Sequence, residues 1–275
     1  MGQLSDTLKR RMSGTDIPSA PQLTAEHAQR WRDPDAARSY RNRAPYPPET
    51  FDLICALIAD EPCTVLDIGC GTGAIARALA PRVVRVDAID LADEMIAEGR
   101  TLPGGDAPNI SWRTAAAETA PLDPPYALIT GGQSLHWMEW RTVLPRFARA
   151  LSPGGMLAVV RVEDEASAPW RAGLLQIVVR HSTAKSYTPF DMLPAWENAG
   201  LFESRGSQLT APVEFVQRVE DFIDAHHAMS TLTRAHIDAG AFDAEVRALL
   251  APYCPDGLLR RSIRGQVDWG RPLAG

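Results

Sequence analysis

The stretch Cys63-Thr-Val-Leu-Asp-Ile-Gly-Cys-Gly-Thr-Gly-Ala74 decides how this chain is expected to fold. Its first part, 63–69, is a short apolar run that ends in glycine, which is typical of a buried strand in a parallel sheet. Glycines at 69, 71 and 73 allow a sharp turn and a close approach of a ligand to the backbone. The stretch therefore predicts a strand, a tight turn and a helix at the carboxyl edge of a sheet, where nucleotide-like cofactors bind.

The pattern around this turn alternates between strands and helices, which predicts an α/β fold with a mainly parallel sheet and helices on both faces. Strands are expected at 63–69, 83–90, 110–113, 126–130 and 156–162, and helices at 24–41 (interrupted by Pro34), 49–60, 74–80, 92–100 and 138–151, the last ended by Pro153-Gly-Gly155. The stretch 44–48 is expected to be extended because of its prolines. Further on, helices are expected at 168–183, 191–199 and 214–252, and strands at 201–211 and 258–269.

The domain organisation follows from these patterns. Residues 1–22 are polar and rich in Ser, Pro and Gly, which predicts a flexible N-terminus. Residues 23–275 then form one domain, with helical cap segments at about 24–48 and 214–252. The segment 214–252 is expected to be an insertion or lid over the carboxyl edge of the sheet.

Composition argues against several classes of partner. The 275 residues carry a formal net charge of −6, which argues against a nucleic-acid groove. No apolar segment approaches the roughly 20 residues that span a bilayer, and no secretory signal is present, so we expect a soluble cytoplasmic protein without a membrane partner. The four cysteines have no CxxC spacing, which indicates reduced thiols and no metal site.

The glycine-rich turn leaves two cofactors open. Gly69, Gly71 and Ala74 formally match the dinucleotide pattern, with Asp90 about 20 residues later, so an NAD-dependent oxidoreductase is one interpretation. Two features favour S-adenosylmethionine. Asp67 can hold an ammonium group where a pyrophosphate would be repelled, and Gly73 adds a third glycine at alternate spacing. Asp90 suits either cofactor, because its carboxylate can accept hydrogen bonds from both ribose hydroxyls.

The segments VLDIGCGTGAIARALA, VDAIDLADEMI and LSPGGMLAVV, at their relative spacings, resemble class I S-adenosylmethionine-dependent methyltransferases of the small-molecule type, which includes the trans-aconitate and ubiquinone-type enzymes. The resemblance implies a Rossmann-like, seven-stranded, mostly parallel sheet whose last strand is antiparallel. It also implies that the cofactor's methionine end lies at Gly69, Gly71 and Gly73, its ribose at Asp90 and its adenine beside Leu91.

The resemblance has one departure at the adenine site. The family usually has an acid at the position of Ala116, and here backbone contact through Ala117 or help from Glu118 would have to substitute. The resemblance also makes Tyr40, Arg43 and Tyr46 part of a segment that closes over the cofactor, with Arg43 meeting its carboxylate. The alternative is a proline-rich linker whose aromatic residues only cover the sheet.

The segment Gly131-Gly-Gln-Ser-Leu-His-Trp137 follows the fourth expected strand, where the family places residues between cofactor and acceptor. Gly131 lets the backbone pass close to the methionine end, and Gln133 can orient the acceptor or the cofactor. His136 is the candidate catalytic base, with a packed structural histidine as the alternative. Adjacent histidines on a helix point apart, so His226-His227 would make a poor metal pair. At most one of them would face the acceptor pocket, and a solvated helix surface is the favoured interpretation.

Together these features predict methyl transfer from S-adenosylmethionine to a small organic molecule, on oxygen, by in-line displacement. A base is needed only if the acceptor must lose a proton, which a carboxylate does not. A non-methylating descendant that keeps the cofactor site is a further alternative. The acceptor pocket is expected from the N-terminal segment and 163–252, while the acceptor and the oligomeric state stay open.

Overall fold

The computed structural model describes residues 30–164, 167–185 and 191–274. The predicted flexible N-terminus 1–22 and the first residues of the helix expected at 24–41 lie outside these ranges. Within them, the 3-10 helix η1 Arg30–Arg32 ends before Asp33 and α3 begins at Pro34, so the helical stretch is interrupted there as predicted. Proline suits the first turn of a helix, and Asp33 caps it by accepting a hydrogen bond from the Asp35 backbone at 2.9 Å.

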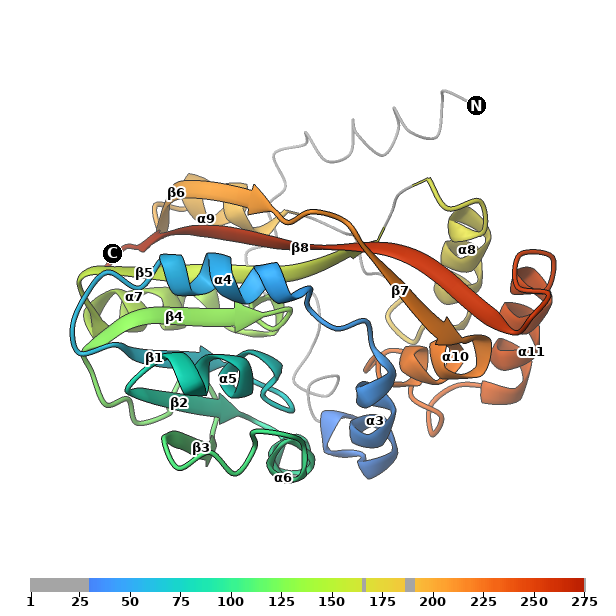
Figure 1. Cartoon of the computed structure of the whole chain (residues 1–275), viewed down its shortest axis with the longest axis horizontal. Coiled ribbons are helices and arrows are strands. Elements are labelled where there is room, and N and C mark those ends of the chain that lie inside the picture. Colours follow the sequence, from blue (N-terminus) through green and yellow to red (C-terminus); the bar gives the residue numbers. More distant parts are fainter. Residues whose placement is uncertain (1–29, 165–166, 186–190, 275) are drawn as a thin grey trace.

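The described strands form one sheet of eight, in the order β3-β2-β1-β4-β5-β8-β6, with β7 also paired to β8 (Figure 1). The first five are parallel to one another and β8 runs against both β5 and β6. The predicted Rossmann-like, mostly parallel sheet with one antiparallel strand is therefore confirmed. The strands are β1 Thr64–Ile68, β2 Arg85–Asp90, β3 Ile110–Thr114, β4 Tyr126–Gly132, β5 Leu151–Asp164, β6 Phe202–Leu209, β7 Val213–Arg218 and β8 Leu258–Pro272.

The described sheet has eight strands, one more than the seven predicted, and the additional strand is β7. The expectation of a helical segment from 214 is wrong for its first residues, which form this strand. The physical reason is the length of β8: its 15 residues extend beyond β6, and β7 pairs with the part from Leu258 to Ile263. A second correction concerns β5, which begins at Leu151 and runs through Pro153, so the prolyl-glycyl stretch lies inside a strand.

Helices cover both faces of the sheet, as predicted. On one face α4 Pro48–Ala56 and α5 Ala74–Leu79 pack on a core that includes Val65; on the other, α7 Trp140–Ala150 and α9 Met192–Asn198 pack on a core that includes Leu66 (Figure 1). Neighbouring residues of a strand point to opposite faces, so β1 contributes to both cores. It is buried along its whole length.

A third core lies beyond the carboxyl ends of β1, β2 and β4 (Figure 1). It is built from α8 Arg171–His181, α10 Val219–His227 and α11 Ala239–Leu250, around Phe222 and the fully buried Phe242. The short helices α3 Pro34–Ser39 and η2 Tyr40–Asn42 contact α10, and α3 also contacts α6 Asp93–Thr101. This cap therefore lies at the edge of the sheet where the glycine-rich turn follows β1. In the described part of the chain, no helix is long and apolar enough to cross a membrane.

Candidate functional site

The glycine-rich turn joins β1 to α5 and needs glycine for backbone reasons. Gly69, Gly71 and Gly73 have φ values of 63°, 56° and 71°, a region that side chains with a Cβ rarely adopt. Packing restricts two of them further. A Cβ at Gly69 would lie 2.4 Å from Cβ of Ser134, and one at Gly73 would lie 2.2 Å from the ring of Trp112.

Asp90 at the end of β2 is tied to this turn. Its carboxylate accepts hydrogen bonds from the backbone N–H of Gly71 at 2.7 Å and of Ala92 at 2.9 Å. Burial raises the pKa of this carboxyl group. A carboxylate has about four acceptor positions, so two remain for a ligand. Asp90 can therefore hold two ribose hydroxyls while it fixes the turn.

A cavity opens above the turn, and most of the predicted cofactor residues line it. These are Tyr40, Arg43, Gly69, Gly71, Asp90, Leu91, Ala117, Glu118 and Gln133. The missing side chain of Gly71 contributes to the space, because a Cβ there would be 3.2 Å from the Met95 methyl group. An acidic group beside a mainly apolar wall fits a nucleoside. These residues therefore fit S-adenosylmethionine.

The same cavity is lined by residues that sequence reasoning did not single out: Trp31, Met95, Ser134, Trp137 and Met138. Trp31 packs edge-to-face on Tyr40, with ring centroids 5.8 Å apart. Ser134 donates a hydrogen bond to the Ile68 carbonyl at 2.8 Å and so joins the loop after β4 to β1. For Trp31, the available signal was an aromatic residue in the same short segment as Tyr40 and Arg43.

Asp67 differs from its predicted role. Its side chain is 1% exposed and does not line the cavity. One carboxylate oxygen accepts from the Ala76 backbone at 3.1 Å and the other from the Thr130 hydroxyl at 2.9 Å. Burial raises the pKa of Asp67 to about 7. These contacts hold α5 and β4 to β1, so the expected contact with the cofactor's ammonium group has no support in the geometry.

Gly73, Gly131 and Tyr46 also do not line the cofactor cavity. Gly73 starts α5, and its lack of a Cβ accommodates Trp112. Gly131 accommodates Leu135, because a Cβ there would lie 2.5 Å from that side chain. Tyr46 packs on Phe51 and lines a neighbouring hollow. The structure thus gives these three residues packing contacts instead of a place on the cofactor wall.

The loop after β4 is shaped by Gln133, the one non-glycine among the described residues with a positive φ, 52°. Its amide oxygen accepts a hydrogen bond from the Arg43 guanidinium at 2.7 Å. That guanidinium also lies 5.1 Å from the centroid of the Tyr40 ring. A non-glycine residue with a positive backbone φ is frequently found at functional sites.

Arg43 and Gln133 line a second cavity as well, between the end of β5 and the cap. Their shared position makes the two cavities neighbours. The other lining residues come from β5, α8, α10, the segments beside these helices, and β8: they include Val162, Asp164, Trp170, Arg171, Leu174, Leu175, Val178, Phe222, Ala225, His226, Met229 and Arg261.

His136 lines another hollow with Arg161, Glu163 and Met192, which shares Gln133 with both cavities described above, while His136 itself lines neither of those two. Its ring is half-buried, with its centroid 5.0 Å from that of Trp137. Burial, together with the positive charge of Arg43, lowers the pKa of His136 to about 4. It is therefore neutral and weakly basic at pH 7.

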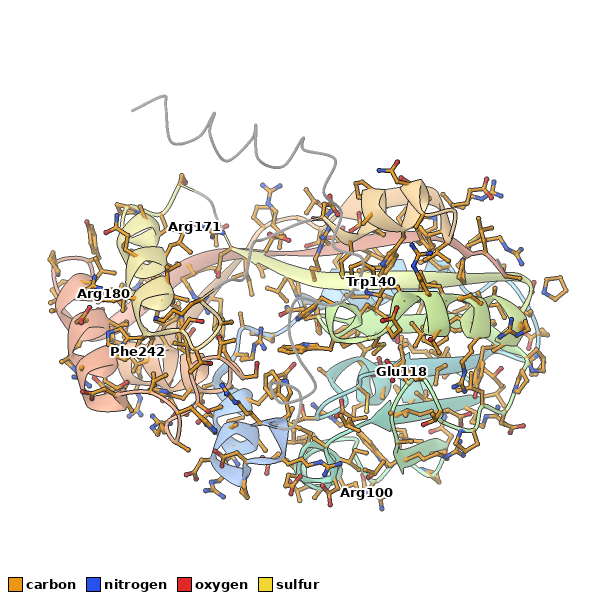
Figure 2. All side chains as sticks on the ribbon, turned by 180° about the vertical axis from the view of Figure 1, so that it is seen from behind. Arg100, Glu118, Trp140, Arg171, Arg180 and Phe242 are labelled. Carbon is orange, nitrogen blue, oxygen red and sulfur yellow. The ribbon has the colours of Figure 1, made fainter. Side chains whose placement is uncertain are left out.

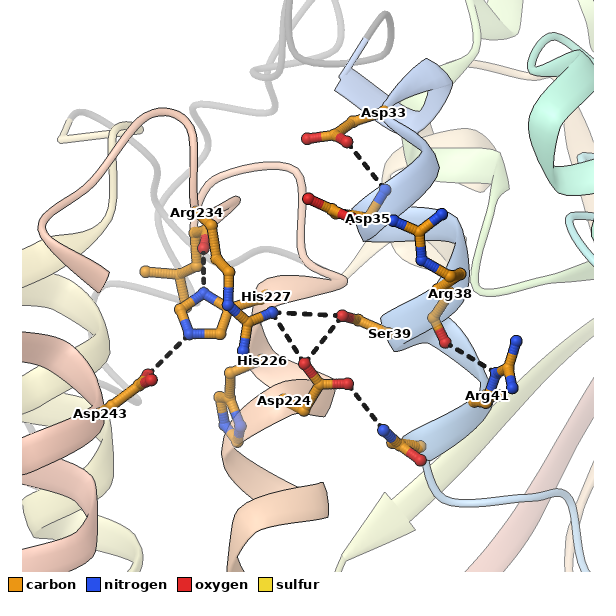
Figure 3. Close-up of polar contacts among 12 residues, drawn as sticks. Asp33, Asp35, Arg38, Ser39, Arg41, Asp224, His226, His227, Arg234 and Asp243 are labelled. Atoms are coloured by element: carbon orange, nitrogen blue, oxygen red, sulfur yellow. Dashed lines mark hydrogen bonds and ion pairs between the residues drawn. The ribbon is translucent and has the colours of Figure 1, made fainter. Parts of the chain in front are cut away.

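The expectation of a solvated surface for His226-His227 is wrong, because α10 packs against α11 on one side and against η2 on the other. His227 is 1% exposed and lies 2.7 Å from a carboxylate oxygen of Asp243 (Figure 3). The Nδ1 atom of His226 is 2.8 Å from the Phe222 carbonyl. That bond requires a proton on Nδ1 and leaves Nε2 as the acceptor in the neutral ring. Of the two, only His226 lines the second cavity.

Among the described residues, no cluster of three or more His, Cys, Asp or Glu side chains is arranged to hold a metal ion.

Comparison with known proteins agrees with this site. A family model described as "Methyltransferase domain" matches residues 65–155. The chain is 32% identical over 234 residues to the biotin biosynthesis bifunctional protein BioCD of Bordetella avium, covering 80% of this chain and 46% of that protein. It is 30% identical over 136 residues to a trans-aconitate 2-methyltransferase of Azoarcus sp., covering 45% and 52%. The chain thus spans about half the length of the curated relatives it matches.

A solved structure described as a type II methyltransferase from Anaeromyxobacter dehalogenans has the same fold. The two superpose with a TM-score of 0.57 at 21% identity, covering 83% of this chain and 97% of that one. The strand order, the glycine-rich turn with Asp90 and the matched domain point to one family. Residues 65–155 match a methyltransferase domain, and this match together with the trans-aconitate 2-methyltransferase relative supports a class I S-adenosylmethionine-dependent methyltransferase.

Proposed function

We propose that this protein transfers the methyl group of S-adenosylmethionine to an oxygen atom of a small organic molecule. The observation that carries the proposal is the adjacency of the two cavities, which share Arg43 and Gln133. One cavity contains the glycine-rich turn and Asp90, which suit the cofactor. Apart from the two shared residues, the other cavity is lined by different side chains. A methyl donor and an acceptor need such neighbouring sites, because in-line displacement requires the two reacting atoms to meet at close range.

S-adenosylmethionine supplies an activated methyl group on a sulfonium, so the chain's residues have mainly to position the reactants. Asp90 would hold the ribose hydroxyls, and Leu91 and Ala117 would contact the adenine, with Glu118 beside them. Gly69 and Gly71 leave room for the backbone to approach the methionine end. Arg43 would meet the cofactor's carboxylate at the boundary between the cavities, while Gln133 holds the arginine in place.

The named activity of the Azoarcus relative supports a small-molecule acceptor for this chain too. Methylation on oxygen is supported by the character of the second cavity, where arginine side chains outnumber carboxylates. Such an environment favours an acceptor that carries oxygen with negative charge over one that carries an amine.

Calorimetric titration with S-adenosylhomocysteine and with NAD tests the cofactor. We expect S-adenosylhomocysteine to bind and NAD not to bind, and Asp90→Asn to weaken the binding about tenfold through the loss of charge-assisted hydrogen bonds to the ribose. Asp93→Asn is the matched control, because this nearby side chain is exposed at the start of α6. Binding of NAD in place of S-adenosylhomocysteine would mean an oxidoreductase. Cofactor binding without methylation of any acceptor would mean a non-methylating descendant.

A further inference from the structure

The second cavity has an excess of positive charge. In the part of the chain that the structure describes, three arginines line it, Arg43, Arg171 and Arg261, against one carboxylate, that of Asp164. Asp164 is already engaged, since both of its oxygens accept from Arg261 at 2.9 Å. Among the described residues, neither Arg43 nor Arg171 forms an ion pair. The cavity therefore keeps a positive charge even when Arg43 is neutralised by the cofactor's carboxylate.

The positive field of Arg43 extends to the histidines around it. Burial is the main reason that the pKa of His226 falls to about 4, and the charges of Arg261 and Arg43 contribute in the same direction. His226 is therefore neutral at pH 7 and adds no charge to the cavity. It is also a weak base, so among the described residues that line the second cavity His226 is poorly suited to removing a proton from an alcohol or phenol.

The rest of the cavity wall is apolar. Trp170 and Phe222 pack edge-to-face with ring centroids 5.7 Å apart, and Leu174 and Met229 complete that side. Leu175 also lines the cavity although 59% of its surface is exposed. Water-exposed apolar surface at such a place favours a ligand with an apolar body.

We propose that the second cavity binds a monocarboxylate with an apolar body, and that the carboxylate oxygen receives the methyl group. The inference rests on the proposed function and specifies its acceptor. Arg171, at the start of α8, holds the carboxylate, because Arg261 already donates to Asp164 and Gln217, and the apolar wall holds the body. The reaction then needs no base, because the acid is ionised at neutral pH.

The chemical balance of this step is simple. The carboxylate oxygen forms a new bond to the methyl carbon while the bond between that carbon and sulfur breaks. The electron pair of the broken bond stays on sulfur, so the sulfonium becomes a neutral thioether. The products are a methyl ester and S-adenosylhomocysteine, and no proton moves.

Binding measurements with matched acids and alcohols test the proposal. The probes are octanoate against 1-octanol, and 3-phenylpropionate against 3-phenylpropan-1-ol, each with and without S-adenosylhomocysteine. Acetate and trans-aconitate complete the set as an acid without an apolar body and a polyacid. We expect octanoate or 3-phenylpropionate to bind at least tenfold more tightly than its alcohol, than acetate and than trans-aconitate. Methyl ester formation from labelled S-adenosylmethionine is the second readout.

Two variants on α8 locate the site. Arg171 and Arg180 lie at opposite ends of this exposed helix (Figure 2), and Arg180 pairs with Glu245 at 2.9 Å instead of lining the cavity. We expect Arg171→Gln to weaken binding of the acid about fivefold, a modest factor because the side chain is partly screened by water. Arg180→Gln should leave binding unchanged.

The possible failures can be told apart. Equal binding of acid and alcohol, tighter binding of trans-aconitate, or equal effects of the two arginine variants would overturn the acceptor class. If S-adenosylhomocysteine binds and neither monocarboxylate does, this inference fails and the proposed function stands. If the acids bind in the expected pattern and the cofactor does not, the proposed function fails while the anion site remains.

Discussion

Asp67 illustrates how burial changes the properties of a single residue. The carboxyl group lies inside the protein with a pKa of about 7, and burial is the main cause. Between about pH 4 and pH 7 the folded chain holds a proton on Asp67 that the unfolded chain has released. Stability contributed by this group is therefore present at low pH and is lost as the pH rises through the folded pKa.

The variant Asp67→Asn tests this linkage. We expect the difference in unfolding free energy between wild type and variant to change across pH 4 to 7. The wild type should become less stable relative to the variant by up to about 1.4 kcal/mol per pH unit as the pH rises. An asparagine can still accept from the Ala76 backbone and donate to the Thr130 hydroxyl, so the contacts can persist. Urea denaturation at several pH values gives the measurement. A difference that does not depend on pH would contradict the raised pKa.

His136 is a second residue whose surroundings decide its role. Its low pKa and its position outside both main cavities favour a packing role over that of a base. We expect His136→Ala to lower kcat by less than about tenfold, whereas loss of a general base costs about 100-fold or more. The rate should stay flat from pH 6 to 9 in wild type and variant. If His136→Ala lowers kcat 100-fold and His136→Gln is equally slow, His136 acts as a base.

At the level of elements, the contact between α10 and the N-terminal helices joins the cap to the cofactor cavity. Asp224 on α10 accepts hydrogen bonds from Ser39 at 2.9 Å, from Asn42 at 2.7 Å and from Arg234 at 2.7 Å (Figure 3). Tyr40 lies between the first two in sequence, and Arg43 follows directly. The carboxylate of Asp224 thus holds the segment that forms one wall of the cofactor cavity.

This contact predicts a change in cofactor affinity from a residue outside the cavity. We expect Asp224→Ala to raise the Kd of S-adenosylhomocysteine about five- to tenfold, because losing these hydrogen bonds costs on the order of 1 kcal/mol. Glu220→Ala is the matched control, since Glu220 pairs with Arg247 on the exposed side of the same helix. Calorimetry and thermal unfolding on both variants provide the data. Equal affinities of the two variants for S-adenosylhomocysteine would show that the Tyr40 and Arg43 wall of the cofactor cavity keeps its place without Asp224.

At the scale of the whole molecule, the three large hydrophobic cores stabilise different parts of the structure. Two of them fix the sheet and its carboxyl edge, where the turn and Asp90 meet. The third holds the cap as a unit of its own, and it places α8 and α10 across from the cofactor cavity. The second cavity forms between these units and is lined by residues from 43 to 261. Its composition is therefore a property of the assembled fold and of no single segment.

The sequence by itself determined the strand, turn and helix around Gly69–Gly73, the order of strands and helices up to β5, and Asp90 as the residue beside the turn. These features are local, because positive φ favours glycine wherever it occurs and buried parallel strands are apolar throughout. Tyr40, Arg43 and Gln133, which the family resemblance and the position after the fourth strand assigned to the site, line the cofactor cavity.

Only the tertiary structure decided the rest. Val213–Arg218 becomes a strand because β8 offers it a partner, and pairing depends on residues far away in sequence. Asp67 turns inward because Thr130 and Ala76 occupy its oxygens, which no spacing near position 67 reveals. The arginines of the second cavity come together from the segment after η2, from α8 and from β8, and charge in a cavity depends on which side chains the fold brings there.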